Sequence, residues 1–420
     1  MLSVEQAFAR ILAFFNVLEV EERPLLEAVG QVLADDAVSP FDIPPLANSA
    51  LDGYAVQASS VRDASPASPV VLKVVGSVSA GELPRDKVGP GTAVRIMTGA
   101  PVPPGADAIV GFEDTDETDR KRNGKVRMDE VAVRVAVETG NAVRPAGQDV
   151  AKGERVLEAG VPLRAAEVGV LASMGFARVN VFRRPIVSIL ATGDELVQPG
   201  ESCPPGSIYN INSFSIASAV QRAGGVPKLL GIARDNLESL QQKIGEGLDA
   251  DMLITTAGVS KGDYDIVKDV LAQRGKIELW SVRMRPAKPL AFGVLRGPQG
   301  RQVPHLGLPG NPVSALVAFE QFGGPAIRKM LGLKLLQYPT IEAVLEDPIH
   351  NADGRRVYAR VVVTKRDGAY HARLTGHQSS NLLTSMARAN GLAICPEDLP
   401  VKKAGEIVKV QMLDWPAEVF

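Results

Sequence analysis

Cysteine and histidine are scarce in this sequence, which contains two cysteines and four histidines in 420 residues. Cys203 and Cys395 lie far apart and belong to no motif with zinc-ligand spacing. This pattern excludes a structural zinc site and indicates a reducing compartment, which we take to be the cytoplasm. No two histidines stand at a metal-ligand spacing either. Any bound metal is therefore expected to be a hard cation held by oxygen atoms.

Three further features are missing. The formal charge of −2 provides no overall basic field, which argues against nucleic acid as a partner. No uninterrupted apolar stretch is long enough to span a bilayer, so we expect a soluble protein without a membrane partner. The N-terminus lacks the basic start and apolar core of a targeting signal and instead predicts a helix, with Ser3 and Gln6 in a capping-box pattern. Any anion site must therefore be built locally.

Residues 40 to 150 predict a small β-rich domain, because short alternating runs stand between turns rich in glycine and proline. Three of these turns carry a carboxylate or hydroxyl group, at Asp52, Thr98 and Asp149. Taken singly, each is better explained by ordinary turn chemistry than by a functional role.

Residues 184 to 332 alternate strands and helices, which predicts a parallel sheet covered by helices. Ligands of such sheets bind beyond the carboxyl ends of the strands. The charged residues expected at those ends are Asp194, Glu195, Asp235, Asp263, Asp265, Arg285 and Lys288.

The stretch from 252 to 265 is the most informative part of that domain. A short apolar strand ends at small residues, and a helical pattern follows. Backbone N–H groups and the positive end of a helix form a seat for an oxyanion, and the neighbouring carboxylates Asp263 and Asp265 indicate a cation. The alternative interpretation is an ordinary strand-to-helix turn with an aspartate cap.

The tail from about residue 336 is again β-rich, with a hairpin turning at Asp367 and Gly368. Just before it, Pro312 is expected to be the first residue of a helix and Asn311 its cap. A final small domain is predicted.

Eight islands of sequence, in order, resemble one family: NSALDGYAV, VRIMTGAPVPPGADAIV, GQD, TGDEL, RD, TTAGVSKGDYD, RPAKPLAFG and LPGNPVSA. Together they are similar to the molybdopterin molybdotransferases, a family that includes bacterial MoeA and the E domain of gephyrin. The resemblance covers essentially the whole chain. It implies a transferase that inserts molybdate into adenylylated molybdopterin with Mg²⁺, releasing AMP in the last step of molybdenum cofactor synthesis.

The resemblance also implies an α/β multidomain fold in an elongated homodimer. The implied parts are a linking domain (1–39 and 151–183), an inserted β-rich domain (40–150), a MogA-like parallel α/β domain that binds molybdopterin (184–335) and a C-terminal β-barrel (336–420). The implied partners are a molybdopterin adenylyltransferase and molybdoenzyme-maturation proteins.

Family positions carry over to matching residues of this sequence. The implied catalytic residues are Asp52, Thr98 and Asp149 on the inserted domain, and Glu195, Asp235 and Asp265 on the α/β domain. The last three would hold Mg²⁺, and the two groups would meet across the dimer in a composite site. The implied contacts to pterin phosphate and molybdate are Thr192, Gly193, Asp194, Gly258, Ser260, Arg285, Lys288, Pro289, Pro309, Gly310, Asn311, Pro312, Ser314, Ser380 and either Arg355 or Arg360.

This sequence departs from the family pattern at a few positions. Ala257 and Ala287 stand where the family has glycine, and Arg285 stands where it has lysine. Two other functions fit parts of the pattern: a related adenylyltransferase that makes adenylylated molybdopterin, and a non-catalytic scaffold. The intact carboxylate set favours the transferase. Molybdate and tungstate both remain possible oxyanions, because they are nearly equal in size and charge.

Overall fold

The structure is a computed structural model that describes residues 1–122, 129–257, 270 and 273–415. The chain divides into two compact units. Unit 1 comprises residues 1–34, 160–164 and 179–420, and unit 2 comprises residues 35–159 and 165–178. This division into two units does not test the four domains that the resemblance implies, and those domains stay a prediction.

A six-stranded sheet forms the middle layer of unit 1. Its spatial order is β15 (Val226–Ala233), β12 (Ile186–Thr192), β16 (Met252–Thr256), β20 (Gln302–Leu308), β19 (Pro289–Arg296) and β17 (Gly275–Ser281). The first four strands run parallel, as the sequence predicts.

The expectation of an entirely parallel sheet was wrong for the other two strands. β19 pairs antiparallel with both β20 and β17. The connections on either side of β19 are short and contain no crossover helix, and parallel neighbours need such a crossover. The sheet is therefore mixed.

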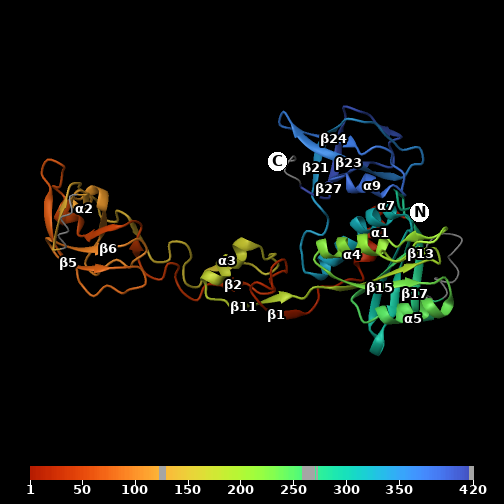
Figure 1. Cartoon of the computed structure of the whole chain (residues 1–420), viewed down its shortest axis with the longest axis horizontal. Helices are drawn as coiled ribbons and strands as arrows, with labels where there is room; N and C mark the ends of the chain where they lie inside the picture. Colours follow the sequence, from red (N-terminus) through yellow and green to blue (C-terminus); the bar gives the residue numbers. More distant parts are fainter. Residues whose placement is uncertain (123–128, 258–269, 271–272, 416–420) are drawn as a thin grey trace. The chain divides into compact units, whose positions relative to one another are not determined.

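Helices cover both faces of this sheet, and Figure 1 shows α1 and α4 on one side of it and α5 on the other. One apolar core packs against α1 (Val4–Leu12), α4 (Asn212–Arg222), α7 (Pro312–Ala318) and α8 (Gly324–Met330), and a second core packs against α5 (Leu237–Gly247). A π-helical turn at Phe319–Gly323 joins α7 to α8. The capping box of Ser3 and Gln6 is present, as predicted.

The C-terminal part of unit 1 is a closed five-stranded barrel, as the resemblance implies. Its strands are β23 (Arg356–Arg366), β24 (Ala369–Leu374), β21 (Thr340–Leu345), β27 (Ile407–Met412) and β25 (Gly391–Cys395), and β23 closes the ring by pairing with β25. The predicted hairpin turns at Asp367 and Gly368, both with positive φ. Strand β18 (Met284–Arg285) adds to β23, and α9 (Leu383–Ala387) lies between β24 and β25 in the chain.

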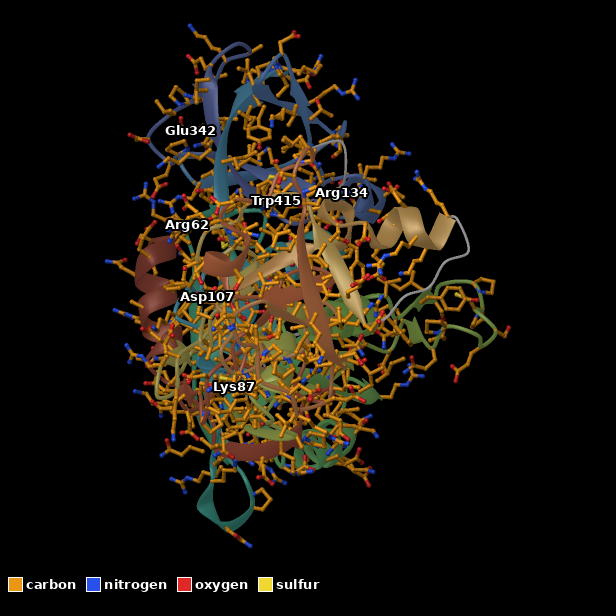
Figure 2. All side chains as sticks on the ribbon, turned by 90° about the vertical axis from the view of Figure 1, so that its left-hand side faces the viewer. Arg62, Lys87, Asp107, Arg134, Glu342 and Trp415 are labelled. Carbon is orange, nitrogen blue, oxygen red and sulfur yellow. The ribbon has the colours of Figure 1, made fainter. Side chains whose placement is uncertain are left out.

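Unit 2 is β-rich, as predicted. Its five-stranded sheet has the order β7 (Ala108–Gly111), β4 (Gly53–Val56), β6 (Thr92–Ile96), β5 (Val70–Val78) and β8 (Glu130–Val133). Helices α2 (Glu117–Arg122) and α3 (Ala165–Ser173) accompany it. Exposed charged side chains of this unit include Arg62 and Lys87, which are labelled in Figure 2.

Short strand pairs complete the chain: β1 (Val20–Pro24) with β11 (Arg178–Phe182), β2 (Ala37–Val38) with β10 (Arg155–Leu157), β3 (Asn48–Ser49) with β9 (Val143–Arg144), β13 (Leu196–Val197) with β14 (Ile208–Tyr209), and β22 (Ile349–His350) with β26 (Val401–Lys402). Within the described part of the chain, no helix has the length and apolar character needed to cross a membrane.

Candidate functional site

The carboxyl ends of β15, β12, β16 and β20 meet at one rim of the sheet in unit 1, because these four neighbouring strands are parallel. β19 runs the opposite way, so its first residues, next to Lys288, lie at the same rim. A cleft of about 1040 Å³ opens there. The position agrees with the rule that ligands of open α/β sheets bind beyond the carboxyl ends of the strands.

Most of the residues of unit 1 that were predicted to contact pterin phosphate or molybdate line this cleft. The lining includes Thr192, Glu195, Arg285, Lys288, Pro289, Pro309, Gly310, Asn311, Pro312, Ser314, Arg355 and Ser380. Gly193, Asp194 and Asp235 follow the same strand ends without belonging to the lining. Gly258, Ser260, Asp263 and Asp265 lie outside the described residues. The structure thus gathers residues that are spread over almost 190 positions of the sequence.

The acidic side of the cleft follows β12 and β15. Gly193 has a φ of 147°, and a Cβ atom there would collide with the carboxylate of Glu195. The positive φ favours glycine here, although the exposed Glu195 side chain could move away from a Cβ atom. The backbone N–H of Asp235 donates to Asp194 Oδ1 at 3.2 Å, which ties the two strand ends together. Oxygen ligands from adjacent strands suit a hard cation.

The predicted magnesium ligands Glu195, Asp235 and Asp265 stay a prediction. Among the described residues, no three His, Cys, Asp or Glu side chains come together as a metal site, and Asp265 lies outside that set. Glu195 is exposed in the cleft, so its carboxylate is accessible to an ion.

The basic side of the cleft carries the two cations Arg285 and Lys288. Within the described part of the chain, neither Arg285 nor Lys288 forms a salt bridge. Arg285 is half-buried and Lys288 is exposed. In a chain with a charge of −2, two cations in one cleft provide a local positive charge, and their assignment to anion binding stays a prediction.

Arg355 and Arg360 occupy different positions. Arg355 lines the cleft, where its guanidinium is paired with Asp353. Arg360 is only 1% exposed and donates to Ser385 Oγ at 3.1 Å and to the Ser379 carbonyl at 3.0 Å. Burial, together with the nearby charge of Arg285, lowers the pKa of Arg360 to about 10. Arg355 therefore faces the cleft, and Arg360 supports the loop that carries Ser379 and Ser380, here called the serine loop.

The serine loop is attached to the start of α7. Asn311 Nδ2 donates to Ser380 Oγ at 3.2 Å, and the Val313 N–H donates to the Ser380 carbonyl at 3.1 Å. Asn311 stands at the predicted cap position, but its side chain makes no capping bond. Pro312 is the first residue of the helix and Asn311 its N-cap, as predicted, but the Asn311 side chain binds Ser380 and does not cap a helix N–H.

Both alanines that the sequence resemblance places at glycine positions adopt the left-handed conformation. Ala257 and Ala287 each have a φ of 75°. This region favours glycine because a Cβ atom approaches the following carbonyl oxygen. Both residues line the cleft, so its wall contains two strained backbone positions.

Several residues of the lining were missed by the sequence reasoning, among them two asparagines. Asn210 and Asn212 stand at the start of α4 and face the cleft. The sequence shows them as the polar start of a helix, a pattern that does not by itself indicate a ligand.

The remaining predicted residues belong to unit 2. Asp52 precedes β4 and accepts two hydrogen bonds from Thr98, which follows β6. Gly53 permits this turn to sit against β7, since a Cβ atom there would collide with the Val110 carbonyl. Asp149 is exposed, and its N–H donates to the Ile43 carbonyl at 2.9 Å.

Comparison with known proteins gives consistent matches along the chain. Residues 2–175 match the model of the MoeA N-terminal region (domain I and II), residues 188–329 that of a probable molybdopterin binding domain, and residues 342–413 that of the MoeA C-terminal region (domain IV).

Two curated relatives and one solved structure resemble the chain over nearly its full length. Molybdopterin molybdenumtransferase 2 of Mycobacterium tuberculosis is 39% identical, over 92% of this chain and 93% of the relative. The molybdopterin molybdenumtransferase of Haemophilus influenzae is 32% identical, over 98% of each. The crystal structure of a molybdopterin biosynthesis MoeA protein from Pyrococcus horikoshii has a TM-score of 0.81 at 32% identity, covering 99% of this chain and 100% of that one.

Proposed function

This chain belongs to the family of MoeA-type molybdopterin molybdenumtransferases, and from that premise we propose that it inserts molybdate into adenylylated molybdopterin and releases AMP with the help of Mg²⁺. A molybdopterin adenylyltransferase would supply this substrate, and molybdoenzyme-maturation proteins would receive the product.

The observation that carries the proposal is the division of charge in one cleft. Arg285 and Lys288 form no salt bridge in the described part of the chain, and they line the same cleft as Ser314, Ser380 and Glu195. An oxyanion and a phosphorylated pterin need cations and hydrogen-bond donors. Cleavage of the AMP linkage needs carboxylates that can hold a divalent ion. One cleft offers both.

Mg²⁺ would be held by Glu195, Asp235 and Asp265, and it would neutralise charge that develops on the phosphate oxygens. The exposed Glu195 carboxylate and the linked ends of β12 and β15 support this assignment. Arg285 and Lys288 would orient molybdate, while Ser380, held by Asn311, would donate a hydrogen bond to the bound anion.

We also propose a homodimer in which Asp52, Thr98 and Asp149 of one subunit complete the site of the other. Support comes from the ionised state of Asp52, which Thr98 stabilises although the carboxylate is exposed. An exposed carboxylate held in one orientation on a small domain is suited to act on a ligand bound elsewhere.

The two alternative functions are not favoured. Adenylyltransferase activity would give no function to the inserted domain and the barrel domain. A scaffold protein would not need the predicted catalytic carboxylates. The curated relatives described above are named as transferases, and they match this chain over almost their whole length.

The direct test measures AMP release from adenylylated molybdopterin by the purified protein in the presence of Mg²⁺. We expect release only when molybdate is added, and strong loss in Glu195→Gln. Tungstate in place of molybdate tests the choice of metal. AMP release at an equal rate without any oxyanion would contradict the proposal.

A further inference from the structure

The guanidinium of Arg355, at the wall of the cleft, is held by two groups outside the cleft lining. Its Nε donates to Asp353 Oδ2 at 2.9 Å, and its Nη2 donates to the same oxygen. Its Nη1 donates to the Met284 carbonyl at 3.4 Å. Arg355 lines the cleft, whereas Asp353 and Met284 do not. The Arg355 side chain is 21% exposed, so it is held without being enclosed.

These bonds leave part of the guanidinium available to a ligand. A guanidinium carries five N–H groups in one plane, one on Nε and two on each terminal nitrogen. Asp353 and Met284 use one N–H of each nitrogen. Among the residues that the structure describes, nothing accepts from the second N–H of Nη1 or of Nη2. Because the group is rigid and planar, holding three N–H groups also fixes the directions of the other two.

A second cation of the cleft lies close to this pair. β18 ends at Arg285 and runs beside the first residues of β23, where the Arg356 N–H donates to the Arg283 carbonyl at 2.9 Å. The hydrogen bond from Arg355 lowers the pKa of Asp353, and the charge of Arg285 adds to this effect. Asp353 is therefore an ionised carboxylate beside the basic side of the cleft.

An acidic side chain in this position has two opposing effects on a bound oxyanion. Its negative charge repels the anion. Its hydrogen bonds hold the guanidinium in one orientation, which reduces the ordering cost of binding. Asp353 concentrates both of its bonds from Arg355 on one oxygen, and each terminal nitrogen keeps an N–H for a ligand. This geometry favours the orienting effect.

We propose that Asp353 is a positioning residue of the oxyanion site, which holds Arg355 so that its two remaining N–H groups bind the anion. This inference rests on the proposed function, because that function gives Arg355 an oxyanion to bind. The resemblance to the family implies Arg355 or Arg360 as a site residue and does not include Asp353. The salt bridge to Asp353 thus gains a role in anion binding.

Two variants of Asp353 separate the orienting effect from the charge. Asp353→Asn and Asp353→Ala remove the same negative charge, but only asparagine keeps an oxygen that accepts from Arg355. The readout is calorimetric titration of the purified full chain with molybdate. We expect Asp353→Asn to bind molybdate roughly two- to fivefold more tightly than Asp353→Ala, which is the size of effect of one exposed ion pair. An effect of charge alone predicts equal affinities.

Two further comparisons show whether Asp353 acts through Arg355. When Arg355→Ala is combined with each Asp353 variant, the two double variants should bind molybdate equally, because no guanidinium remains to be held. The matched control is Glu397, which accepts from Nε and Nη2 of Arg356 at 3.0 and 3.2 Å, and neither of these residues lines the cleft. Glu397→Gln and Glu397→Ala should therefore have equal molybdate affinities.

Equal molybdate affinities of Asp353→Asn and Asp353→Ala would overturn the inference. A difference that persists in the Arg355→Ala background would also overturn it, because Asp353 would then act on the structure of the loop and not through the guanidinium. In both cases the wild type still binds molybdate, and the proposed function stands. A wild-type chain that does not bind molybdate would contradict the proposed oxyanion site itself, which separates the two failures.

Discussion

Thr98 binds the carboxylate of Asp52 twice. Its backbone N–H and its hydroxyl group both donate to Asp52 Oδ1, each at 2.7 Å. These two hydrogen bonds, first the backbone one and then the hydroxyl one, lower the pKa of Asp52. Because the side chain is exposed, the ionised carboxylate is both oriented and accessible. Thr98 is therefore better described as a residue that positions Asp52 than as an independent catalyst.

The first prediction tests this relationship with Thr98→Val, which keeps the backbone donor and removes the hydroxyl. The pKa of Asp52 should rise toward its ordinary value, because one of its two hydrogen bonds is lost. A lowered pKa stabilises the folded state above the ordinary pKa and loses this effect as the pH falls through the lowered value. The titration of the Asp52 carboxyl carbon by NMR measures the change. Thr98→Ser retains a hydroxyl and should titrate like the wild type, and an unchanged Thr98→Val titration would contradict the argument.

Local patterns in the sequence predicted the parts of the fold that depend on neighbouring residues. The capping box of Ser3 and Gln6 and the hairpin turn at Asp367 and Gly368 are both determined within a few positions. The rim of the cleft was also predictable, since parallel strands place their carboxyl ends together.

Features that depend on distant residues could not be predicted in this way. The N-cap position of Asn311 was predictable, but the hydrogen bond from its amide to Ser380, almost 70 residues away, was not. The hydrogen bond from the Asn212 amide to the Gly310 carbonyl likewise joins residues that lie far apart in the sequence. The choice between Arg355 and Arg360 likewise depends on which side chain the barrel buries.

The second prediction concerns the composite site of the dimer. Asp52→Asn and Glu195→Gln chains should each be inactive alone, because each lacks one half of the proposed site. A mixed dimer contains one intact site, so statistical mixing of a symmetric dimer should restore about a quarter of wild-type AMP release. Subunit exchange verified by mass spectrometry, followed by the AMP assay, is the measurement. Mixed dimers that remain inactive would reject the shared site.

The third prediction concerns the strain at Ala257. Its φ of 75° costs an alanine about 1 to 2 kcal/mol, whereas glycine gains about 0.4 to 1 kcal/mol of extra freedom in the unfolded chain. Ala257→Gly should therefore stabilise the protein by about 0.5 to 1 kcal/mol in urea unfolding. Ala287→Gly should gain less, because its methyl group is buried and its contacts would be lost.

Ala9→Gly is the control for this comparison. Ala9 is exposed in the interior of α1, where glycine costs about 1 kcal/mol relative to alanine. The same substitution should therefore have opposite signs at positions 9 and 257. Equal destabilisation at both would show that Ala257 is not strained.

The fourth prediction concerns Lys288 as part of the oxyanion site. Lys288 has no acidic partner in the described part of the chain, so its charge is available to an anion at the rim where β19 begins. Removing a charged hydrogen-bond donor costs about 1.5 to 3 kcal/mol. Lys288→Ala should therefore raise the molybdate concentration needed for half-maximal AMP release by roughly ten- to a hundredfold.

Two comparisons separate this effect from general damage. The Mg²⁺ dependence of Lys288→Ala should stay near that of the wild type, because the proposed Mg²⁺ ligands are carboxylates on the other side of the cleft. Lys276→Ala removes an equal charge from β17, where the side chain is 86% exposed and paired with Glu278, and it should leave the molybdate requirement unchanged. An unchanged molybdate requirement in Lys288→Ala would remove this lysine from the site. Molybdate would then have to be held by Arg285 and the hydrogen-bond donors around Ser380, which Asn311 fixes at the start of α7.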